Sequence, residues 1–334
     1  MQILGTVAEL RQWSRAHRSA GRSIGLVPTM GALHAGHASL IRAAAASCSQ
    51  VVVSIFVNPT QFGPNEDYAR YPRTFDADCA LAESEGSAAI FAPSVEDLYP
   101  AGAATIIDVE GLSNRLDGAS RPGHFRGVAT VVSKLFIAAE PDRAFFGQKD
   151  AAQVAVLRRM TTDLLLPVEI VVCPIVRDAD GLALSSRNIY LSPAERARAL
   201  VLSQAVHKVE SLAATGERRA SVLLEAAHQL FAAVPEVRID YIALVDWATL
   251  LPVEAAIPGT LFAAAAYVGA TRLIDNAVLD SDALREPSRR LEIRTLEERD
   301  REGYIRKPQN ADESRLGEAE VSIPLRNLPS SLHS

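Results

Sequence analysis

Two histidines three positions apart, His34 and His37, are the first residues whose types and spacing could do chemistry. They belong to the segment PTMGALHAGH, where a strand predicted for residues 23–28 gives way to a helix expected from near His37 to about residue 47. The first N–H groups of a helix lack backbone partners, and the helix dipole places positive charge at the same end. An anion binds readily there, and imidazoles can donate further hydrogen bonds to its oxygens. The pattern therefore indicates phosphate binding.

The histidine pair has two other interpretations, because it could ligate a metal ion or have no function. Gly31 and Gly36 carry no Cβ and would let a nucleotide approach the backbone closely, which favours phosphate. Cys48, Cys79 and Cys173 lie far apart and form no CxxC pair. A cysteine-containing zinc site and a disulfide framework are therefore not indicated, and a reducing compartment is expected.

A second group of phosphate-binding residue types lies in RDADGLALSSRN, residues 177–188. Ser185, Ser186 and Arg187 are consecutive there, in a predicted loop that contains a glycine. Hydroxyls and guanidinium groups bind phosphate well, and one arginine can contact two oxygens at once. A turn followed by a helix cap is the alternative interpretation of this segment.

Two further motifs follow predicted strands. In FGQKDAAQ, residues 146–153, the ammonium group of Lys149 could meet an α-phosphate, or it could be a solvated lysine that caps a helix. In NPTQFG, which follows a strand predicted for residues 50–57, Asn58 and Gln61 could orient a small polar substrate. An ordinary loop is the alternative for this second segment.

The order of the predicted elements indicates the α/β class. Helical patterns at residues 127–139 and 150–165 alternate with apolar strand patterns. The strands are expected at residues 23–28, 50–57, 87–92, 143–147 and 168–174. Such alternation is typical of a parallel sheet with helices on both faces, and these sheets bind ligands beyond the carboxyl ends of their strands. Because all four motifs follow strands, we expect them to converge in one crevice.

The chain changes character twice after this predicted sheet. Ser192 and Glu195 have the spacing of a helix-initiating capping box, and strand patterns at residues 237–246 and 259–275 follow a helical stretch. Beyond residue 280 the chain carries 10 Lys or Arg and 11 Asp or Glu residues, which is typical of a solvated helix or a flexible segment. The expected parts are a parallel-sheet domain at 1–175, a smaller α+β domain at 176–280 and a charged extension at 281–334.

Bulk properties limit the classes of protein that fit. The 334 residues carry a net charge of −6, which gives no electrostatic support to general nucleic-acid binding. The N-terminal segment becomes charged within a dozen residues, and no uncharged apolar run reaches the ~18 residues needed to cross a bilayer. We therefore expect a cytoplasmic protein with no membrane or nucleic-acid partner.

Taken together, the motifs resemble those of one family. PTMGALHAGH, SIFVNPTQFGPNEDYARYPRT, RPGHFRGV, FGQKDAAQ and GLALSSRN occur in the order and spacing of the pantoate–β-alanine ligase family, over about residues 1–280. In this resemblance HAGH matches the HIGH signature of a nucleotidyltransferase superfamily, and LSSRN matches its mobile phosphate-binding signature. The resemblance implies a Rossmann-like domain, a smaller C-terminal domain and a homodimer. It also implies that ATP, with Mg²⁺, drives the joining of pantoate to β-alanine through a pantoyl adenylate.

The resemblance assigns roles to individual positions of this chain. It implies catalytic roles for His34, His37 and Lys149, with His37 as a proton donor. It places pantoate on Gln61 and Gln153, and β-alanine near Gln61 and Asn58. The implied ATP-binding residues are Met30, Gly31, Ala32, Leu33, His34, Ala35, Gly36, His37, Gly147, Gln148, Lys149, Asp150, Val176, Leu184, Ser185, Ser186 and Arg187. Mg²⁺ is expected on phosphate oxygens and water, without a protein metal site.

Two departures from the family pattern stand out. The family usually has glutamine where this chain has Ala152, and a change of packing alone is expected there because Gln153 is present. The extension beyond residue 280 is unusual for the family and contains no convergent motif. Two rival functions are compatible with the motifs: an enzyme of the same fold that adenylates a different acid, and a regulatory or scaffolding protein that retains the nucleotide pocket.

Overall fold

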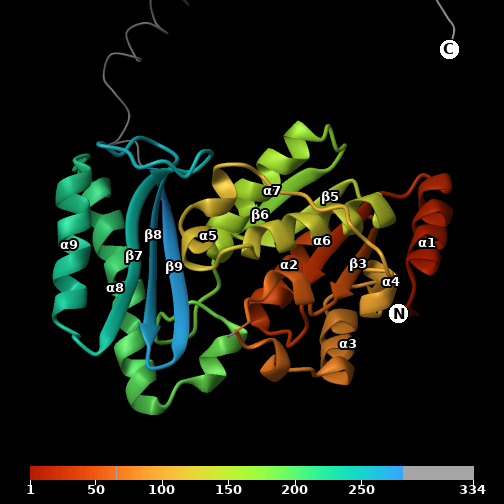
Figure 1. Ribbon diagram of the computed structural model, residues 1–334, viewed down its shortest axis with the longest axis horizontal. Helices are drawn as coiled ribbons and strands as arrows, with labels where there is room; N and C mark the ends of the chain where they lie inside the picture. Colours follow the sequence, from red (N-terminus) through yellow and green to blue (C-terminus); the bar gives the residue numbers. More distant parts are fainter. Residues whose placement is uncertain (65, 281–334) are drawn as a thin grey trace, which may run out of the picture. The chain divides into compact units, whose positions relative to one another are not determined.

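The computed structural model describes residues 1–64 and 66–280 of the chain, and the charged extension predicted for residues 281–334 lies outside the described residues. The described part contains a six-stranded and a three-stranded sheet, each covered by helices (Figure 1). The α/β class expected from the sequence is confirmed. Among the helices of residues 1–64 and 66–280, none combines the length and apolar character required to cross a membrane.

The six-stranded sheet is entirely parallel. Its strands are β1 (Gln2–Leu4), β2 (Ile24–Thr29), β3 (Gln50–Ile55), β4 (Ala89–Phe91), β5 (Arg143–Gly147) and β6 (Glu169–Cys173). They lie in the order β1-β4-β3-β2-β5-β6. From β2 the chain adds β3 and β4 on one side, and it then returns to add β5 and β6 on the other side of β2. The β2/β5 boundary is thus a topological switch point, where open α/β sheets bind ligands. The sequence pattern did not predict β1, a three-residue edge strand.

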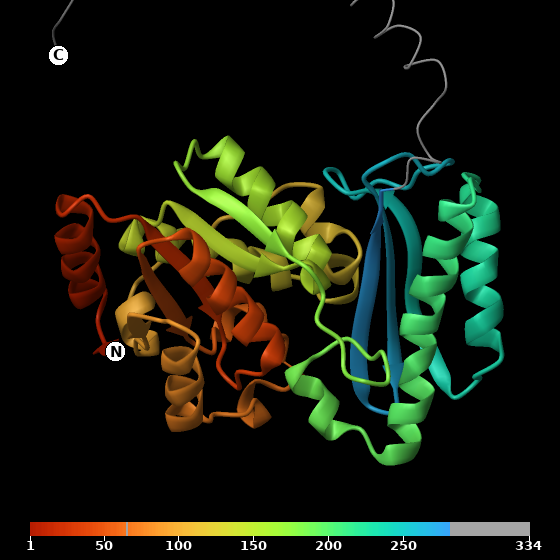
Figure 2. The ribbon, with the colours of Figure 1, turned by 180° about the vertical axis from the view of Figure 1, so that it is seen from behind.

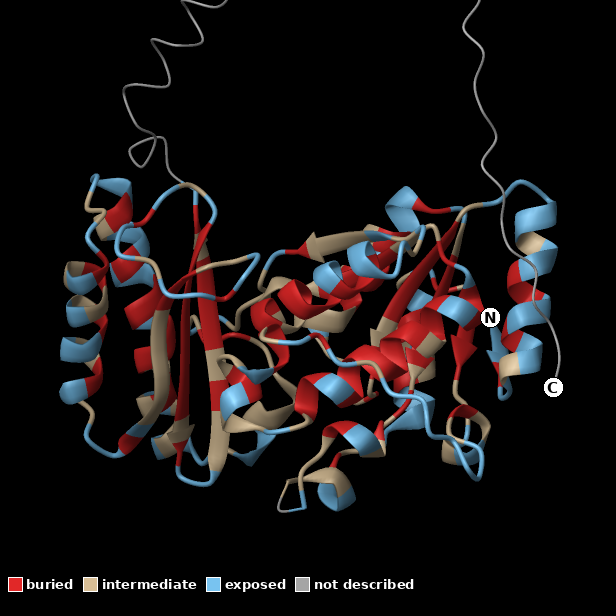
Figure 3. Ribbon diagram, turned by 45° about the horizontal axis from the view of Figure 1, so that its top comes forward, coloured by how far each residue is buried: buried red, intermediate tan, exposed pale blue. Residues whose placement is uncertain are grey.

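The six-stranded sheet has a hydrophobic core on each of its two faces. In β3, Val52 packs with α1 (Val7–Ser19), α6 (His124–Ala139) and α7 (Ala151–Asp163). Its neighbours Val51 and Val53 pack on the other face, against α2 (Ala35–Ser47) and α3 (Phe75–Ser84). Successive side chains of a strand point to opposite faces, so a continuous apolar run is required where both faces are covered. Figure 2 shows the sheet from the side opposite to Figure 1, and Figure 3 shows burial concentrated along the strands and the inner helix faces.

The part of the chain that carries the three-stranded sheet begins with α8 (Pro193–Ala214), which pairs with α9 (Ala220–Ala232). As predicted, Ser192 and Glu195 form a capping box that satisfies the first N–H groups of α8. The strand pattern predicted for residues 259–275 is in fact a hairpin, β8 (Thr260–Val268) and β9 (Thr271–Leu279), joined at Gly269 in a positive-φ conformation.

β8 lies between β7 (Val237–Asp246) and β9, and all three strands are antiparallel. β9 is the strand nearest the six-stranded sheet (Figure 1). The two parts are joined directly, because Trp247 Nε1 donates to the carbonyl of Ala151 at 2.9 Å and side chains of β9 reach the loops that follow β5 and β6. The three-stranded sheet therefore forms one wall of the crevice at the switch point.

Candidate active site

The segments that follow β2, β5 and β6 meet in a cleft of about 160 Å³, which we call the nucleotide cleft. It brings together residues from the three predicted phosphate-binding motifs. Its lining consists of Met30, His34, Gly36, His37, Leu40, Tyr71, Gly147, Lys149, Asp150, Pro174, Ile175, Val176, Leu184, Ser185, Ser186 and Arg187. The predicted convergence at the carboxyl ends of parallel strands is thus present for three of the four motifs, whereas Asn58 and Gln61 of the fourth motif do not line this cleft.

The two histidines cap the helix that they introduce. α2 begins at Ala35, two residues earlier than expected, and His34 is its N-cap residue. His34 Nδ1 accepts the backbone N–H of Gly36 at 3.1 Å, and His37 Nδ1 accepts the backbone N–H of His34 at 3.3 Å. A Cβ at position 36 would lie 2.8 Å from His34 Cε1, so only glycine leaves room for this cap. The spacing of HAGH is explained by this reciprocal cap.

These contacts determine which imidazole nitrogen carries the proton. Because Nδ1 of His34 and His37 accepts a hydrogen bond, a neutral ring carries its proton on Nε2, which is then a donor. Burial and the charge of Lys149 lower the pKa of His34 to about 4. Burial, His34 and Lys149 together lower the pKa of His37 to about 3. At neutral pH both rings are therefore uncharged donors, and the positive charges of the cleft are those of Lys149 and Arg187.

Asp78 of α3 holds the loop that leads into this cap. It is 2% exposed, and its two carboxylate oxygens accept the backbone N–H groups of Leu33 and Ala32 at 2.8 and 2.9 Å. Ala32 and Gly31 both have positive φ, and a Cβ on Gly31 would lie 3.0 Å from the Asp78 carboxylate. The carboxylate thus fixes a backbone conformation that most residues avoid. Sequence reasoning did not identify Asp78.

Lys149 lies in the 3₁₀ turn η4 (Gln148–Asp150), between β5 and α7. Its Nζ lies 3.8 Å from the Asp150 carboxylate, and the side chain is about one-fifth exposed. From β9, the amide nitrogen of Asn276 donates to the carbonyls of Gln148 at 3.0 Å and Lys149 at 2.9 Å. The turn that carries the ammonium group is therefore held by the second sheet, a contact that the motif itself does not reveal.

Arg187 lies in η5 (Ser186–Tyr190), whose first turn is capped by the Ser185 hydroxyl. Its guanidinium forms a bidentate ion pair with Asp67, at 3.0 Å for both contacts. Burial alone would raise the pKa of Asp67, but the pairing with Arg187 outweighs it and lowers that pKa. The hydroxyls of Ser186 and Tyr71 lie 3.3 Å apart, so the segment after β3 and the phosphate-binding segment also contact each other.

Asn58 is almost fully buried, and its amide is saturated by protein groups. Its nitrogen donates to Gln61 Oε1 and the Gly127 carbonyl, both at 3.1 Å, and its oxygen accepts from Thr60 and Tyr99. Gln61 in turn places its amide nitrogen 3.1 Å from Met30 Sδ, beside the nucleotide cleft. The structure therefore places Asn58 behind Gln61; both side chains are buried, at 1% and 8% exposed.

A second, smaller pocket of about 50 Å³ adjoins the nucleotide cleft, and we call it the inner pocket. It is lined by Asp117, Arg121, His124, Phe125, Lys149, Asp150, Gln153, Ser185, Arg187, Arg272, Leu273 and Ile274. Lys149, Asp150, Ser185 and Arg187 line both cavities. Ala152 is 3% exposed and belongs to the core, so it lines neither cavity.

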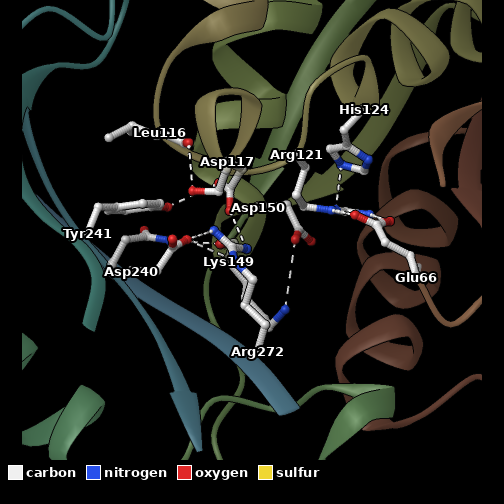
Figure 4. A network of polar contacts seen from close by, with 12 residues as sticks. Glu66, Leu116, Asp117, Arg121, His124, Lys149, Asp150, Asp240, Tyr241 and Arg272 are labelled. Carbon is white, nitrogen blue, oxygen red and sulfur yellow. Dashed lines mark hydrogen bonds and ion pairs between the residues drawn. The ribbon is translucent and has the colours of Figure 1, made fainter. Parts of the chain in front are cut away.

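A network of charged groups closes the inner pocket on the β9 side (Figure 4). The Arg272 guanidinium pairs with Asp117 at 2.7 Å and with Asp240 at 2.8 Å, and Tyr241 donates to Asp117 at 3.1 Å. Burial, and next the charge of Asp117, raises the pKa of Tyr241 well above its usual value. Tyr241 is therefore a neutral donor in this network, which joins α5 (Asp117–Ser120) to both outer strands of the second sheet.

A second network lies at the RPGHFRGV motif. Arg121 forms a bidentate ion pair with Glu66 at 2.6 and 2.8 Å and lies 3.0 Å from His124 Nε2. His124 Nδ1 lies 2.9 Å from the Gln61 carbonyl and must donate to it, so Nε2 of the neutral ring accepts from Arg121. Burial and Arg121 lower the pKa of His124 to about 4. Gln61 is thus held from both sides, by Asn58 and by His124.

The predicted ATP-binding residues fall into two groups in the structure. Twelve of the seventeen line the nucleotide cleft, whereas Gly31, Ala32, Leu33, Ala35 and Gln148 shape its backbone without lining it. Sequence reasoning missed Leu40, Tyr71, Pro174 and Ile175 as lining residues. Tyr71 lies inside a quoted motif and could have been selected, but the other three are apolar or proline residues with no distinguishing chemistry.

The fold and site define a class of protein: an α/β nucleotide-binding protein whose predicted phosphate-binding residues lie at the switch point of a parallel sheet, beside a second pocket. The family model for pantoate-beta-alanine ligase matches residues 2–278. The chain belongs to the pantoate–β-alanine ligase family.

Curated relatives and solved structures agree with this assignment. The pantothenate synthetase of Acidobacterium capsulatum is 65% identical over 77% of this chain and 86% of its own length. That of Moorella thermoacetica is 56% identical over 84% and 99%. The crystal structure of pantothenate synthetase from Thermus thermophilus has a TM-score of 0.79 at 47% identity, covering 84% of this chain and 100% of that one.

A further solved structure carries ligands. It is the pantoate-beta-alanine ligase of Francisella tularensis complexed with beta-gamma ATP and beta-alanine, with a TM-score of 0.68 at 32% identity. The match covers 85% of this chain and 99% of that one. These matches bear out the expected fold and family over the described sheets.

Proposed function

We propose that this protein joins (R)-pantoate to β-alanine at the expense of ATP, through a pantoyl adenylate, with release of AMP and pyrophosphate. The observation that carries the proposal, together with the family assignment, is the pair of adjoining cavities. Lys149, Asp150, Ser185 and Arg187 line both of them. An acid held in the inner pocket would thus lie next to the phosphates of a nucleotide held in the cleft, as attack on the α-phosphorus requires.

In the first step, a carboxylate oxygen of pantoate attacks the α-phosphorus and the bond to the pyrophosphate breaks. Charge increases on the departing phosphates, and His34 and His37 offer neutral Nε2–H donors to them. Lys149 supplies the positive charge near the α-phosphate. His37 is the family's assigned proton donor, and its low pKa in the ligand-free protein means that bound ATP would have to raise that pKa before protonation.

Arg187 and Ser185 are proposed to bind the outer phosphates. Since Arg187 is paired with Asp67, a triphosphate that binds Arg187 must share or displace that carboxylate. The nucleotide cleft of about 160 Å³ is also smaller than the roughly 300–1,000 Å³ of typical ligand pockets. Both observations favour movement of the LSSRN segment when ATP enters, in keeping with its resemblance to a mobile signature.

Gln61 and Gln153 are proposed to hold pantoate, with Asn58 positioning Gln61 near the entry of β-alanine. In the second step, the β-alanine amine attacks the acyl carbon of the adenylate, the amine loses a proton, and AMP departs with the carboxylate oxygen. No covalent bond to the protein is needed. The side chains position the reactants and stabilise phosphate charge.

Several finer features belong to the same proposal. Mg²⁺ would arrive with ATP, and within residues 1–64 and 66–280 no three His, Cys, Asp or Glu side chains are grouped to hold a metal ion. The ion would be held mainly by phosphate oxygens and water, because Mg²⁺ dehydrates reluctantly and commonly binds through substrate phosphates. The resemblance further supports a homodimer and the assignment of HAGH to the HIGH signature, and the three widely separated cysteines support a cytoplasmic location.

ATP–pyrophosphate exchange with a panel of carboxylic acids tests the proposal. Exchange that requires (R)-pantoate and proceeds without β-alanine is expected, because the adenylate forms before the amine is needed. Exchange with a different acid, and none with pantoate, would identify another adenylating enzyme of the same fold. Absence of exchange with every acid, despite nucleotide binding, would favour a regulatory or scaffolding role.

A further inference from the structure

Asn276 is a buried polar residue of β9 that faces the loop after β5. It is 3% exposed. Its amide nitrogen donates to two consecutive carbonyls, those of Gln148 at 3.0 Å and Lys149 at 2.9 Å. Its amide oxygen lies 3.3 Å from the side-chain nitrogen of Gln148, which donates to it. The Asn276 side chain thus forms three hydrogen bonds with the turn η4.

The position of Asn276 is itself fixed from two directions. Its backbone lies in the ladder opposite Ala263 of β8. The preceding residue, Asp275, accepts the backbone N–H of Asn276 at 2.8 Å and forms a bidentate ion pair with Arg177 at 2.6 and 3.0 Å. Arg177 also donates to the Gly181 carbonyl, in the segment that leads to Leu184 and Ser185. β9 therefore contacts the η4 backbone directly and, through Arg177, the backbone of the segment that leads to Ser185.

The turn that Asn276 grips has little regular structure of its own. η4 is a single 3₁₀ turn of three residues between β5 and α7, and such turns have poorer hydrogen-bond geometry than an α-helix. Lys149 has a flexible four-carbon stem, so the place of its ammonium group depends on where the backbone holds its base. Asn276 binds the backbone carbonyl of Lys149 itself.

We propose that Asn276 is a positioning residue for Lys149: by holding the η4 backbone from the second sheet, it sets the distance between the ammonium group and the α-phosphate. The inference rests on the proposed function, because it assigns Lys149 to the adenylation step. It also gives the second sheet a part in the first chemical step, through a residue that lines neither cavity. A displacement of about 1 Å in a charged group can cost about 10²-fold in rate.

A double-mutant cycle tests the inference. Asn276→Ala, Lys149→Ala and the double variant are compared by single-turnover formation of pantoyl adenylate from ATP and (R)-pantoate. We expect Asn276→Ala to slow this step about tenfold in the wild-type background and less than twofold when Lys149 is already alanine, because coupled residues are non-additive. A loss of the same size in both backgrounds, or no loss in the first, would overturn the inference.

Two further variants separate positioning from folding. Asn276→Ser keeps a hydroxyl donor, so it should form the adenylate at least threefold faster than Asn276→Ala. Equal rates for the two variants would count against a hydrogen-bonding role. Arg115→Ala removes a hydrogen bond to the Thr249 carbonyl in the loop that follows β7, from a residue that lines neither cavity. This control should leave adenylation within about twofold.

The wild-type protein distinguishes failure of this inference from failure of the proposed function. If wild-type protein forms no pantoyl adenylate, the proposed function fails and the Asn276 cycle has no signal to measure. If wild-type protein is active and the cycle is additive, only the positioning role of Asn276 is wrong. Thermal unfolding of every variant shows whether a rate loss reflects the fraction of folded protein.

Discussion

His34 and His37 cap one another across the first turn of α2: the His37 ring accepts the backbone N–H of His34 at 3.3 Å, and the ring centroids lie 4.2 Å apart. The His34 ring accepts the backbone N–H of Gly36 in the same turn. Because both Nδ1 atoms are used for helix capping, both Nε2 atoms are left as donors for a ligand. The local demands of helix initiation and the chemical demands of phosphate binding are met by the same two side chains.

The first prediction concerns the tautomers. In nitrogen NMR spectra at pH 7, His34 and His37 should be neutral Nε2–H tautomers, whereas His124, which donates through Nδ1 to Gln61, should be the Nδ1–H tautomer. None of the three should gain a proton between pH 7.5 and 5.5, because burial lowers their pKa values to about 4, 3 and 4. A signal that titrates near pH 6.5 for any of them would contradict this geometry.

The second prediction concerns stability against pH. The pKa of His124 is about 4 in the folded protein and about 6.5 when unfolded, so the unfolded chain binds its proton first as pH falls. The free energy of unfolding should therefore decrease from pH 7 to pH 5, by about 2 kcal/mol for this group alone. Urea unfolding of His124→Gln should show a smaller decrease over this range. The exposed His228→Gln is the matched control and should behave as wild type.

The third prediction concerns Asp78. Asp78→Asn replaces one acceptor oxygen with an amide donor that faces a backbone N–H of residue 32 or 33. We expect a loss of about 2 kcal/mol in the free energy of unfolding and at least tenfold weaker ATP binding, since the loop before His34 loses its anchor. Calorimetric titration with ATP measures the second effect. Asp76→Asn, on the exposed face of α3, controls for charge and should change neither quantity substantially.

The fourth prediction concerns Asp67. If the Asp67 carboxylate competes with phosphate for Arg187, Asp67→Asn should tighten ATP binding about fivefold, which corresponds to the ~1 kcal/mol of one partly exposed ion pair. Glu66→Gln is the matched control, because the adjacent carboxylate pairs with Arg121 instead. Weaker ATP binding by Asp67→Asn would show that Asp67 orients Arg187 for phosphate and does not compete with it.

Local patterns in the sequence predicted much of this architecture. Apolar runs located five of the six parallel strands, and the Ser192–Glu195 spacing located the start of α8, because these signals depend on neighbours within one element. The edge strand β1 was missed, although β4 is equally short, because QIL holds only two consecutive apolar residues, whereas β4 lies within the longer apolar run SAAIFA. The single strand predicted for residues 259–275 became a hairpin because the turn signal is confined to Gly269.

The supporting side chains of the site could not be predicted in the same way. Asp78 binds a backbone N–H 45 residues away, Asp67 pairs with a guanidinium 120 residues away, and Asn276 grips a carbonyl 127 residues away. Each is an ordinary polar residue in its own segment, and its role exists only once the sheets bring the segments together. The HAGH and LSSRN motifs were found because their caps are formed within two or three residues.

The central claim is that a carboxylate oxygen of pantoate attacks the α-phosphorus of ATP. It is tested most directly by turning over (R)-pantoate labelled with ¹⁸O in its carboxylate, in the presence of ATP and β-alanine, and analysing the products by mass spectrometry. The account predicts that AMP carries one ¹⁸O atom and that pyrophosphate carries none. Unlabelled AMP, or label in inorganic phosphate released together with ADP, would contradict it.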